Sequence, residues 1–277
     1  MDILLHTIAV EPARWTPQRV SMPLVQLLPH FARNGFTRIE IFEPHLESEE
    51  HWPGIREALR ESAIEAVILS SYLNLRVAAT SDQELEKQID RLERCAAAFG
   101  FQKVRIFPSA DLDHESVRIF KERLRRLATR IPHIEILLET HDGSLADDPA
   151  LLVRIMEELG LPNVGLLFQP TFFERSRVSE QFHVEKPFIR HLHLQGRSAA
   201  HSFVTLKEGV ADWEEIIAEL DGTVGATLEF VPGAICPVEQ FDLTASLKEA
   251  RDEVDYVLTV QSRKESPGQS AALIPKP

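Results

Sequence analysis

The chain has 277 residues, of which 44% are hydrophobic and 26% are charged, as is ordinary for a soluble globular protein of one or two domains. With 43 acidic and 30 basic residues the formal net charge is −13, which would repel a phosphate backbone and argues against nucleic-acid binding. No apolar run approaches the roughly 18 residues of a membrane span, and the N-terminus lacks the features of a signal peptide. We therefore expect a cytoplasmic protein with no nucleic-acid or membrane partner.

Eight short apolar runs follow one another along the chain with longer segments between them. Several are nearly continuous in Val, Ile and Leu, as is typical of strands that are buried on both faces of a parallel sheet. They begin at Ile3, Arg38, Glu65, Lys103, Ile134, Val164, Ile189 and Gly225.

The segments between the runs have helical periodicity. The clearest is 81–100, which opens with a capping-box-like Ser81 and Glu84 and ends at Gly100, a typical helix stop. Pro29 predicts a kink or break in the first helix, and the periodicity of 171–188 is weak. The other predicted helices are 23–35, 114–131, 148–160, 212–222 and 238–258.

Eight strands that alternate with helices, without a linker between them, indicate an α/β protein with a single (β/α)8 TIM barrel. A doubly wound sheet usually has fewer strands, and the chain has no GxGxxG segment. We expect the barrel to cover residues 1–261. The segment 262–277 is rich in Pro, Ser and Gly, which predicts a disordered C-terminal tail.

Four successive strands end in side chains that bind metals or transfer protons: Glu139, Gln169, His193 and Glu229. The carboxyl ends of barrel strands converge on one pocket, so we expect these groups to meet. Their donor atoms suit Mn²⁺, Co²⁺ or Mg²⁺, with Zn²⁺ as a further candidate. The alternative is a buried hydrogen-bond network without an ion, in which one of the two carboxyl groups would have a strongly raised pKa.

The segments NGFTRIEIF, KVRIFPS, LLETHDGSLADDP, NVGLLFQP, HLHLQGR, LKEGVADWEEIIAEL and TLEFV resemble, in order and spacing, those of one family. This is the xylose isomerase-like TIM-barrel family of sugar phosphate isomerases and epimerases, to which endonuclease IV is related. The resemblance covers the chain up to the tail. It implies that Glu139, His193 and Glu229 bind a metal, with Gln169 at a fourth position where the family usually has Asp.

The resemblance also implies a mechanism. Glu139 and Glu229 would act as catalytic acid and base on opposite faces of a sugar or polyol, next to its carbonyl, while the metal stabilises the enediolate. Glu40 resembles a family glutamate that orients other polar groups. The candidate substrate-binding residues are His141, Arg105, Arg197 and Glu43. Of these, a buried Arg105 needs an acidic partner.

The expected function is therefore a metal-dependent isomerase or epimerase in carbohydrate metabolism, acting on a small-molecule sugar, and a homo-oligomer stays open. Two alternatives remain. The same site would support a dehydratase or lyase that acts on a keto-sugar or keto-inositol. The neutral Gln169 keeps open a metal-free, non-catalytic sugar-binding barrel.

Overall fold

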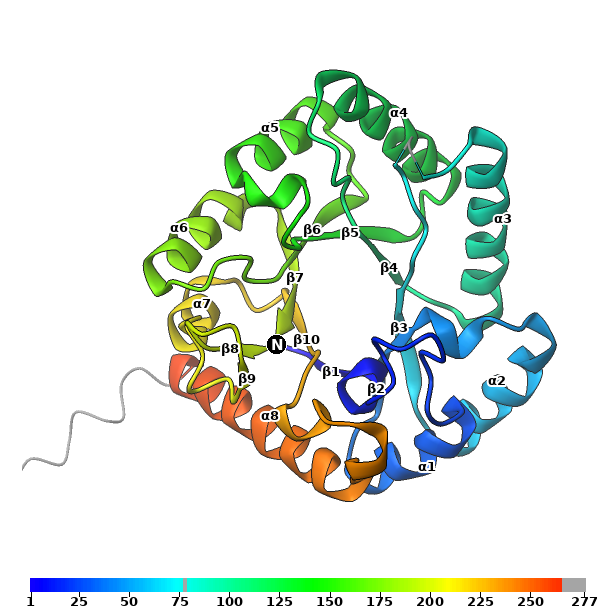
Figure 1. The fold of residues 1–277 in the computed structure, drawn as a ribbon, viewed down its shortest axis with the longest axis vertical. Coiled ribbons are helices and arrows are strands. Elements are labelled where there is room, and N and C mark those ends of the chain that lie inside the picture. Colours follow the sequence, from blue (N-terminus) through cyan, green and yellow to red (C-terminus); the bar gives the residue numbers. More distant parts are fainter. Residues whose placement is uncertain (77–78, 266–277) are drawn as a thin grey trace, which may run out of the picture.

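The computed structural model describes residues 1–76 and 79–265. Its centre is a closed barrel of eight parallel strands, in the order β1-β10-β7-β6-β5-β4-β3-β2, surrounded by a ring of helices (Figure 1). The barrel strands are β1 (Ile3–His6), β2 (Arg38–Phe42), β3 (Glu65–Ser70), β4 (Lys103–Ile106), β5 (Glu135–Glu139), β6 (Val164–Phe168), β7 (Ile189–Leu194) and β10 (Gly225–Leu228).

The helices that cover the barrel follow the strands in turn. They are α1 (Leu24–Arg33), α2 (Trp52–Glu61), α3 (Asp82–Phe99), α4 (His114–Arg130), α5 (Pro149–Leu159), α6 (Arg175–Glu185), α7 (Trp213–Glu219) and α8 (Leu243–Glu265). The (β/α)8 fold is thus confirmed. Within the described ranges, every helix is too short or too polar to span a lipid bilayer.

Some local predictions need correction. The first apolar run leaves the sheet after His6, and Thr7–Val10 form a 3-10 helix. Pro29 lies within α1, which continues to Arg33 without a break. Helix α2 was not predicted, nor was the hairpin of β8 (Gly196–Arg197) and β9 (Phe203–Val204). Helix α8 runs to Glu265, and the rest of the predicted tail lies outside the described residues.

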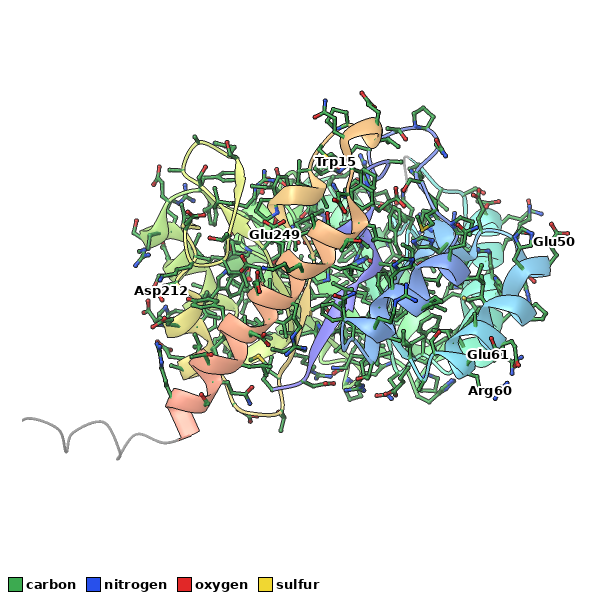
Figure 2. The ribbon with its side chains drawn as sticks, turned by 90° about the horizontal axis from the view of Figure 1, so that it is seen from below. Trp15, Glu50, Arg60, Glu61, Asp212 and Glu249 are labelled. Atoms are coloured by element: carbon green, nitrogen blue, oxygen red, sulfur yellow. The ribbon has the colours of Figure 1, made fainter. Side chains whose placement is uncertain are left out.

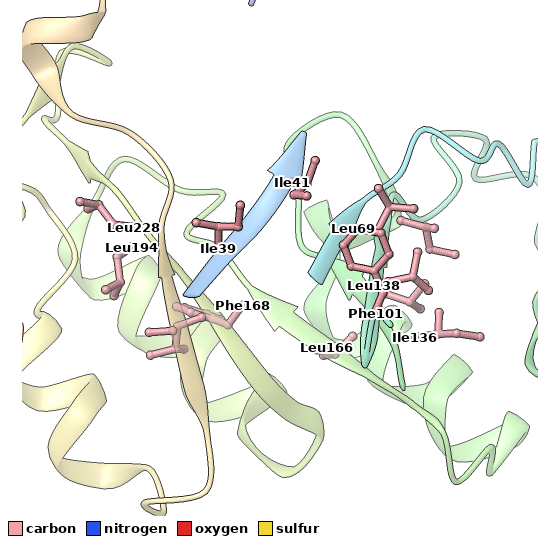
Figure 3. Packing of buried hydrophobic residues seen from close by; sticks show 14 of the residues in the cluster. Ile39, Ile41, Leu69, Phe101, Ile136, Leu138, Leu166, Phe168, Leu194 and Leu228 are labelled. Carbon is pink, nitrogen blue, oxygen red and sulfur yellow. The ribbon is translucent and has the colours of Figure 1, made fainter. Parts of the chain in front are cut away.

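Two apolar layers build the barrel. The larger one packs the outer faces of the strands against the helices, and Figure 3 shows part of it, including Ile39, Ile136, Leu166 and Leu228. The smaller one fills the inside of the barrel and consists of Leu4, Val67, Ile68, Leu137 and Leu167.

The inner layer determines where polar groups can lie. Side chains two positions apart on a strand point to the same face. His6 therefore follows Leu4 into the barrel, and Glu139 follows Leu137. Both polar side chains lie nearer the carboxyl ends of their strands than the leucines do. The carboxyl end of the barrel is thus polar inside, above an apolar floor.

The segment between β1 and α1 lies at this polar end. Figure 2 places Trp15 at the opposite end of the molecule from Arg60 and Glu61, which end helix α2. Buried Glu11 holds the base of this segment, because its carboxylate accepts hydrogen bonds from the backbone N–H groups of Ala13 and Ser21. The Trp15 side chain is 64% exposed at the tip.

Candidate metal and catalytic site

The four predicted strand-end residues meet inside the barrel. The Nδ1 atom of His193 lies 3.6 Å from Glu139 Oε1, 3.5 Å from Glu229 Oε1 and 3.4 Å from Gln169 Oε1. One donor atom from each of Glu139, His193 and Glu229 can be chosen so that all three lie within 4.8 Å of one another. All four residues are buried, with at most 7% of any of them exposed. The arrangement brings two carboxylates, a carboxamide and an imidazole to one point.

The side-chain amide of Gln169 lies between the two carboxylates and fits there in either of two orientations. With the oxygen inward, Oε1 is 2.8 Å from both Glu139 Oε1 and Glu229 Oε2; with the amide turned over, its nitrogen donates to those two atoms. Neighbouring ligands of an octahedral ion at about 2.1 Å are roughly 3 Å apart, so the oxygen-inward spacing fits a shared cation. Three oxygens this close would otherwise repel one another.

A further carboxylate, that of Glu40, contacts His193 at Nε2, on the side of the ring away from the other three groups. His193 Nε2 lies 3.2 and 3.1 Å from the two oxygens of Glu40, and both side chains are fully buried. Burial opposes a charged ring, but Glu40 and Glu229 raise the pKa of His193 well above its ordinary value, so without a metal both ring nitrogens carry a proton. A metal that displaced the Nδ1 proton would find the Nδ1 lone pair directed at the other three groups while Nε2–H donates to Glu40, as in the carboxylate–histidine–metal arrangement. The orienting role that the resemblance implied for Glu40 agrees with these contacts.

His6 supports Glu40 in turn. Its Nδ1 accepts the N–H of Ile8, so Nε2 carries the proton and lies 3.0 Å from Ser70 Oγ and 3.4 Å from Glu40 Oε1. Burial lowers the pKa of His6 to about 3, so the ring is neutral at physiological pH. For Glu40, His193 and His6 outweigh burial and hold the pKa well below its ordinary value. Glu40 is therefore a fixed negative charge next to His193.

Glu139 is the acidic partner that the burial of Arg105 requires. Arg105 Nε lies 2.8 Å from Glu139 Oε2, and both side chains are at most 2% exposed. The guanidinium also lies over the rings of Phe107 and Tyr72, at 4.3 and 5.7 Å from their centroids. Arg105 thereby occupies one oxygen of Glu139 and leaves the other facing His193.

The two site glutamates have different electrostatic surroundings. Burial alone would raise the pKa of Glu139, but Arg105 and His193 reverse this effect and lower it to about 2. Glu229 is as close to His193 but forms no ion pair with Arg105, and burial raises its pKa to about 7. The acid form is therefore much more accessible to Glu229 than to Glu139, which is the usual division between a proton donor and a permanent carboxylate.

The other predicted residues lie farther out. The ring of His141 stands edge-on to Phe107, and its Nδ1 lies 2.8 Å from the carbonyl oxygen of Asp142. Glu43 forms an ion pair with Arg91, at 2.6 Å, on the α3 side of the barrel mouth. Neither is brought into contact with the strand-end cluster. Arg197 lines a pocket above Gln169 and is half-buried.

Two contributors to the site, His6 and Tyr72, were not predicted from the sequence. His6 belongs to a run that was predicted to continue as strand to Val10, which hid its position at a strand end. Tyr72 follows β3 and covers Arg105, but nothing in its local sequence distinguishes it from a packing residue. The order of the apolar and polar positions on β1, read with period two, was the only available signal for His6.

The sequence model of the xylose isomerase-like TIM barrel family matches residues 29–253, and the chain belongs to this family. A comparison with curated proteins found no significant match.

Among solved structures, the probable 3-DHS dehydratase AsbF of Bacillus anthracis shares 21% identity and a TM-score of 0.69, over 90% of this chain and 98% of that one. A xylose isomerase-like barrel of Mycobacterium smegmatis in complex with magnesium shares 16% identity, over 95% and 97% of the two chains, with a TM-score of 0.68. The D-psicose 3-epimerase of Clostridium cellulolyticum H10 shares 13% identity, over 94% and 99%, with a TM-score of 0.64. These similarities establish the fold.

Proposed function

We propose that the protein is a divalent-metal-dependent isomerase or epimerase that moves a proton next to the carbonyl of a sugar or sugar-like polyol. The proposal rests on a buried cluster in which Glu139, His193 and Glu229 surround one point. The Gln169 amide lies 2.8 Å from both carboxylates of this cluster. These four side chains would hold the cation. When bound, a divalent ion polarises carbonyl and hydroxyl oxygens and stabilises an enediolate.

The remaining chemistry falls to side chains of this chain. Glu229 is suited to hold a proton and Glu139 to stay ionised, because only Glu139 lies against Arg105. Positioned carboxyl groups of this kind contribute typically 10²–10⁴-fold to a proton transfer. Glu40 keeps the His193 ring in one orientation, and Tyr72 and Phe107 separate Arg105 from bulk water. The inner apolar floor closes the other end of the site.

The same residues would support the loss of a β-hydroxyl, because an enolate with a proton donor beside it can expel water. The similarity to a probable dehydratase favours this outcome as a variant of the proposal. Incubation of the Mn²⁺-loaded protein with ketohexoses and with cyclic β-hydroxy ketones in D₂O, followed by NMR, separates the two. An epimerase exchanges the α-proton and retains the hydroxyl, whereas a dehydratase forms an unsaturated product.

A metal-free sugar-binding barrel is the second candidate, and the turned-over Gln169 amide favours it, because its nitrogen then joins the two carboxylates without an ion. Metal analysis of protein purified without chelator, followed by Mn²⁺ and Co²⁺ titrations, decides between the two. Stoichiometric binding that is lost in Glu229→Gln supports the enzyme. A matched control is Glu253→Gln, which changes a buried glutamate on α8 that binds the backbone of Leu206. Failure of every divalent ion to bind the wild-type protein would overturn the enzyme proposal.

A further inference from the structure

A small pocket opens directly above the candidate metal site. It has a volume of about 190 Å³, and its lining includes the side chains of Gln169 and Gln195. Aromatic residues from four separate segments also line it: Trp15, Phe173, Phe203 and Phe230. Because Gln169 contacts both the pocket and the two site carboxylates, a molecule in the pocket lies next to the cluster.

Arg197 is the cation of this pocket, and among residues 1–76 and 79–265 its guanidinium contacts aromatic rings rather than a carboxylate. Its guanidinium lies 4.0 Å from the ring centroid of Phe203 and 5.5 Å from that of Phe173. Within the described part of the chain, no carboxylate lies within ion-pair distance of it. Two other arginines differ in this respect, because Arg105 on β4 pairs with Glu139 and Arg91 on α3 pairs with Glu43.

Asp142, an acidic residue of this pocket, forms no ion pair with Arg197: burial lowers the pKa of Arg197, and the charges of Asp142 and Glu229 offset this only in part. Asp142 lines the pocket, but its carboxylate lies 3.3 Å from Nδ1 of His141 and is 64% exposed. A half-buried guanidinium without a bound carboxylate has donors available and is well placed to bind an anion in a bidentate manner. The rings of Phe203 and Phe173 cover part of Arg197, which reduces the screening of such a contact by water.

The composition of the metal site points the same way. Gln169 is neutral, so the cation would be held by only two acidic ligands, Glu139 and Glu229. Glu40 adds one negative charge behind His193 and Arg105 adds one positive charge, so a divalent ion would bring these formal charges to zero. An Asp in place of Gln169 would leave a net negative charge at the pocket floor. The carboxamide therefore removes a repulsion that an anionic ligand would meet.

We propose that the substrate carries an anionic group, a carboxylate or a phosphate, which binds Arg197 while the reacting carbon faces Glu229. This inference rests on the proposed function and specifies its substrate class as small, hydroxylated and negatively charged. A neutral hydroxylated molecule would offer the guanidinium only hydroxyl oxygens as acceptors, and hydrogen bonds to these are weaker than those to a carboxylate or phosphate.

Isothermal titration of two matched pairs of probes tests the inference, both with and without Mn²⁺. The carboxylate pair is quinate and its neutral amide, and the phosphate pair is fructose 6-phosphate and fructose. The expected result is that the anionic member of one pair binds at least about tenfold more tightly than its neutral counterpart. The pair that shows this preference identifies the anion.

Three variants test whether Arg197 causes the preference for the anionic probe. Arg197→Gln should abolish the preference for the anionic probe. Gln169→Asp should reduce this preference and should tighten Mn²⁺ binding. Arg177→Gln is the matched control, because Arg177 also lies over a phenylalanine ring, 4.0 Å from that of Phe172, but is exposed on α6 outside the pocket. It should leave the preference unchanged.

Equal binding of the charged and neutral probes, a preference that survives Arg197→Gln, or no binding of any of the four probes would overturn the inference. The proposed function fails separately, by the absence of Mn²⁺ binding. The titrations without Mn²⁺ still measure the preference of Arg197 in that case, so the two failures are distinguishable.

Discussion

Replacement of Glu40 by Gln should weaken divalent-metal binding although Glu40 is not one of the proposed ligands. Its carboxylate lies 3.1 Å from His193 Nε2, and both side chains are 0% exposed, so solvent does not screen the contact. Gln keeps the size of the side chain and an oxygen that can accept the His193 N–H, but it removes the charge. The basicity of Nδ1 on the opposite side of the ring should fall as a result.

The size of the effect follows from the type of hydrogen bond that is lost. Hydrogen bonds to charged groups contribute about 1.5–3 kcal/mol and neutral ones about 0.5–1.5 kcal/mol, so the change is roughly 1–1.5 kcal/mol. That corresponds to about a tenfold weaker Kd, at the lower end of the 10–100-fold loss typical of such outer residues. The negative charge of Glu40 also favours a proton on His193 Nδ1, and this proton competes with the metal. A divalent cation is attracted more strongly than a proton by the charge of Glu40, so the net effect of Glu40 is to favour the metal.

The assay is Mn²⁺ titration by calorimetry, with thermal unfolding measured in parallel to confirm that the variant is folded. Glu43→Gln is the control, since Glu43 lies one residue beyond the end of the same strand but pairs with Arg91. A Kd for Glu40→Gln within about twofold of wild type, when the control is also unchanged, would refute the reasoning.

Three further predictions concern charge in the barrel and its helices. Gln169→Asp should tighten Mn²⁺ binding by adding a negative ligand, and an unchanged calorimetric Kd would remove Gln169 from the ligand shell. Arg105→Met should lower the unfolding free energy by about 3–5 kcal/mol in urea, because it leaves Glu139 buried without its cation. Its surface control, Arg118→Met, should cost much less, because solvent screens the exposed ion pairs of Arg118, and equal losses would contradict this. Burial raises the pKa of Glu185 well above its ordinary value, so its stabilising contribution is complete below about pH 4 and falls as pH rises through the folded-state pKa. Glu185→Gln should therefore help stability more at about pH 8 than at about pH 5, and a pH-independent difference in urea midpoints would argue against it.

The fold was predictable because the strands repeat one simple pattern. Every residue of a run such as VGLLF is buried. Each run is followed by a helix whose apolar positions recur at helical spacing. The same signal was present for α2, where buried Trp52, Ile55 and Leu59 are spaced by three and four residues. The omission of α2 was therefore a failure to read a pattern that was there.

Part of the site was also predictable, since parallel strands bring their carboxyl ends together whatever the lengths of the loops. The sequence could not reveal which partner each group would take. The contact of His193 with Glu40 spans 153 residues. The lack of an acid beside Arg197 depends on where Asp142 points, and the orientation of the Gln169 amide depends on what occupies the space between two carboxylates.

The central claim is that Glu139, His193, Glu229 and Gln169 together hold one divalent cation. Anomalous scattering from crystals grown with Mn²⁺ tests it directly. We expect a single strong peak between the two carboxylates, His193 Nδ1 and the Gln169 oxygen, and the loss of that peak in Glu229→Gln crystals. No peak at this position, with the Gln169 nitrogen donating to both carboxylates instead, would contradict it.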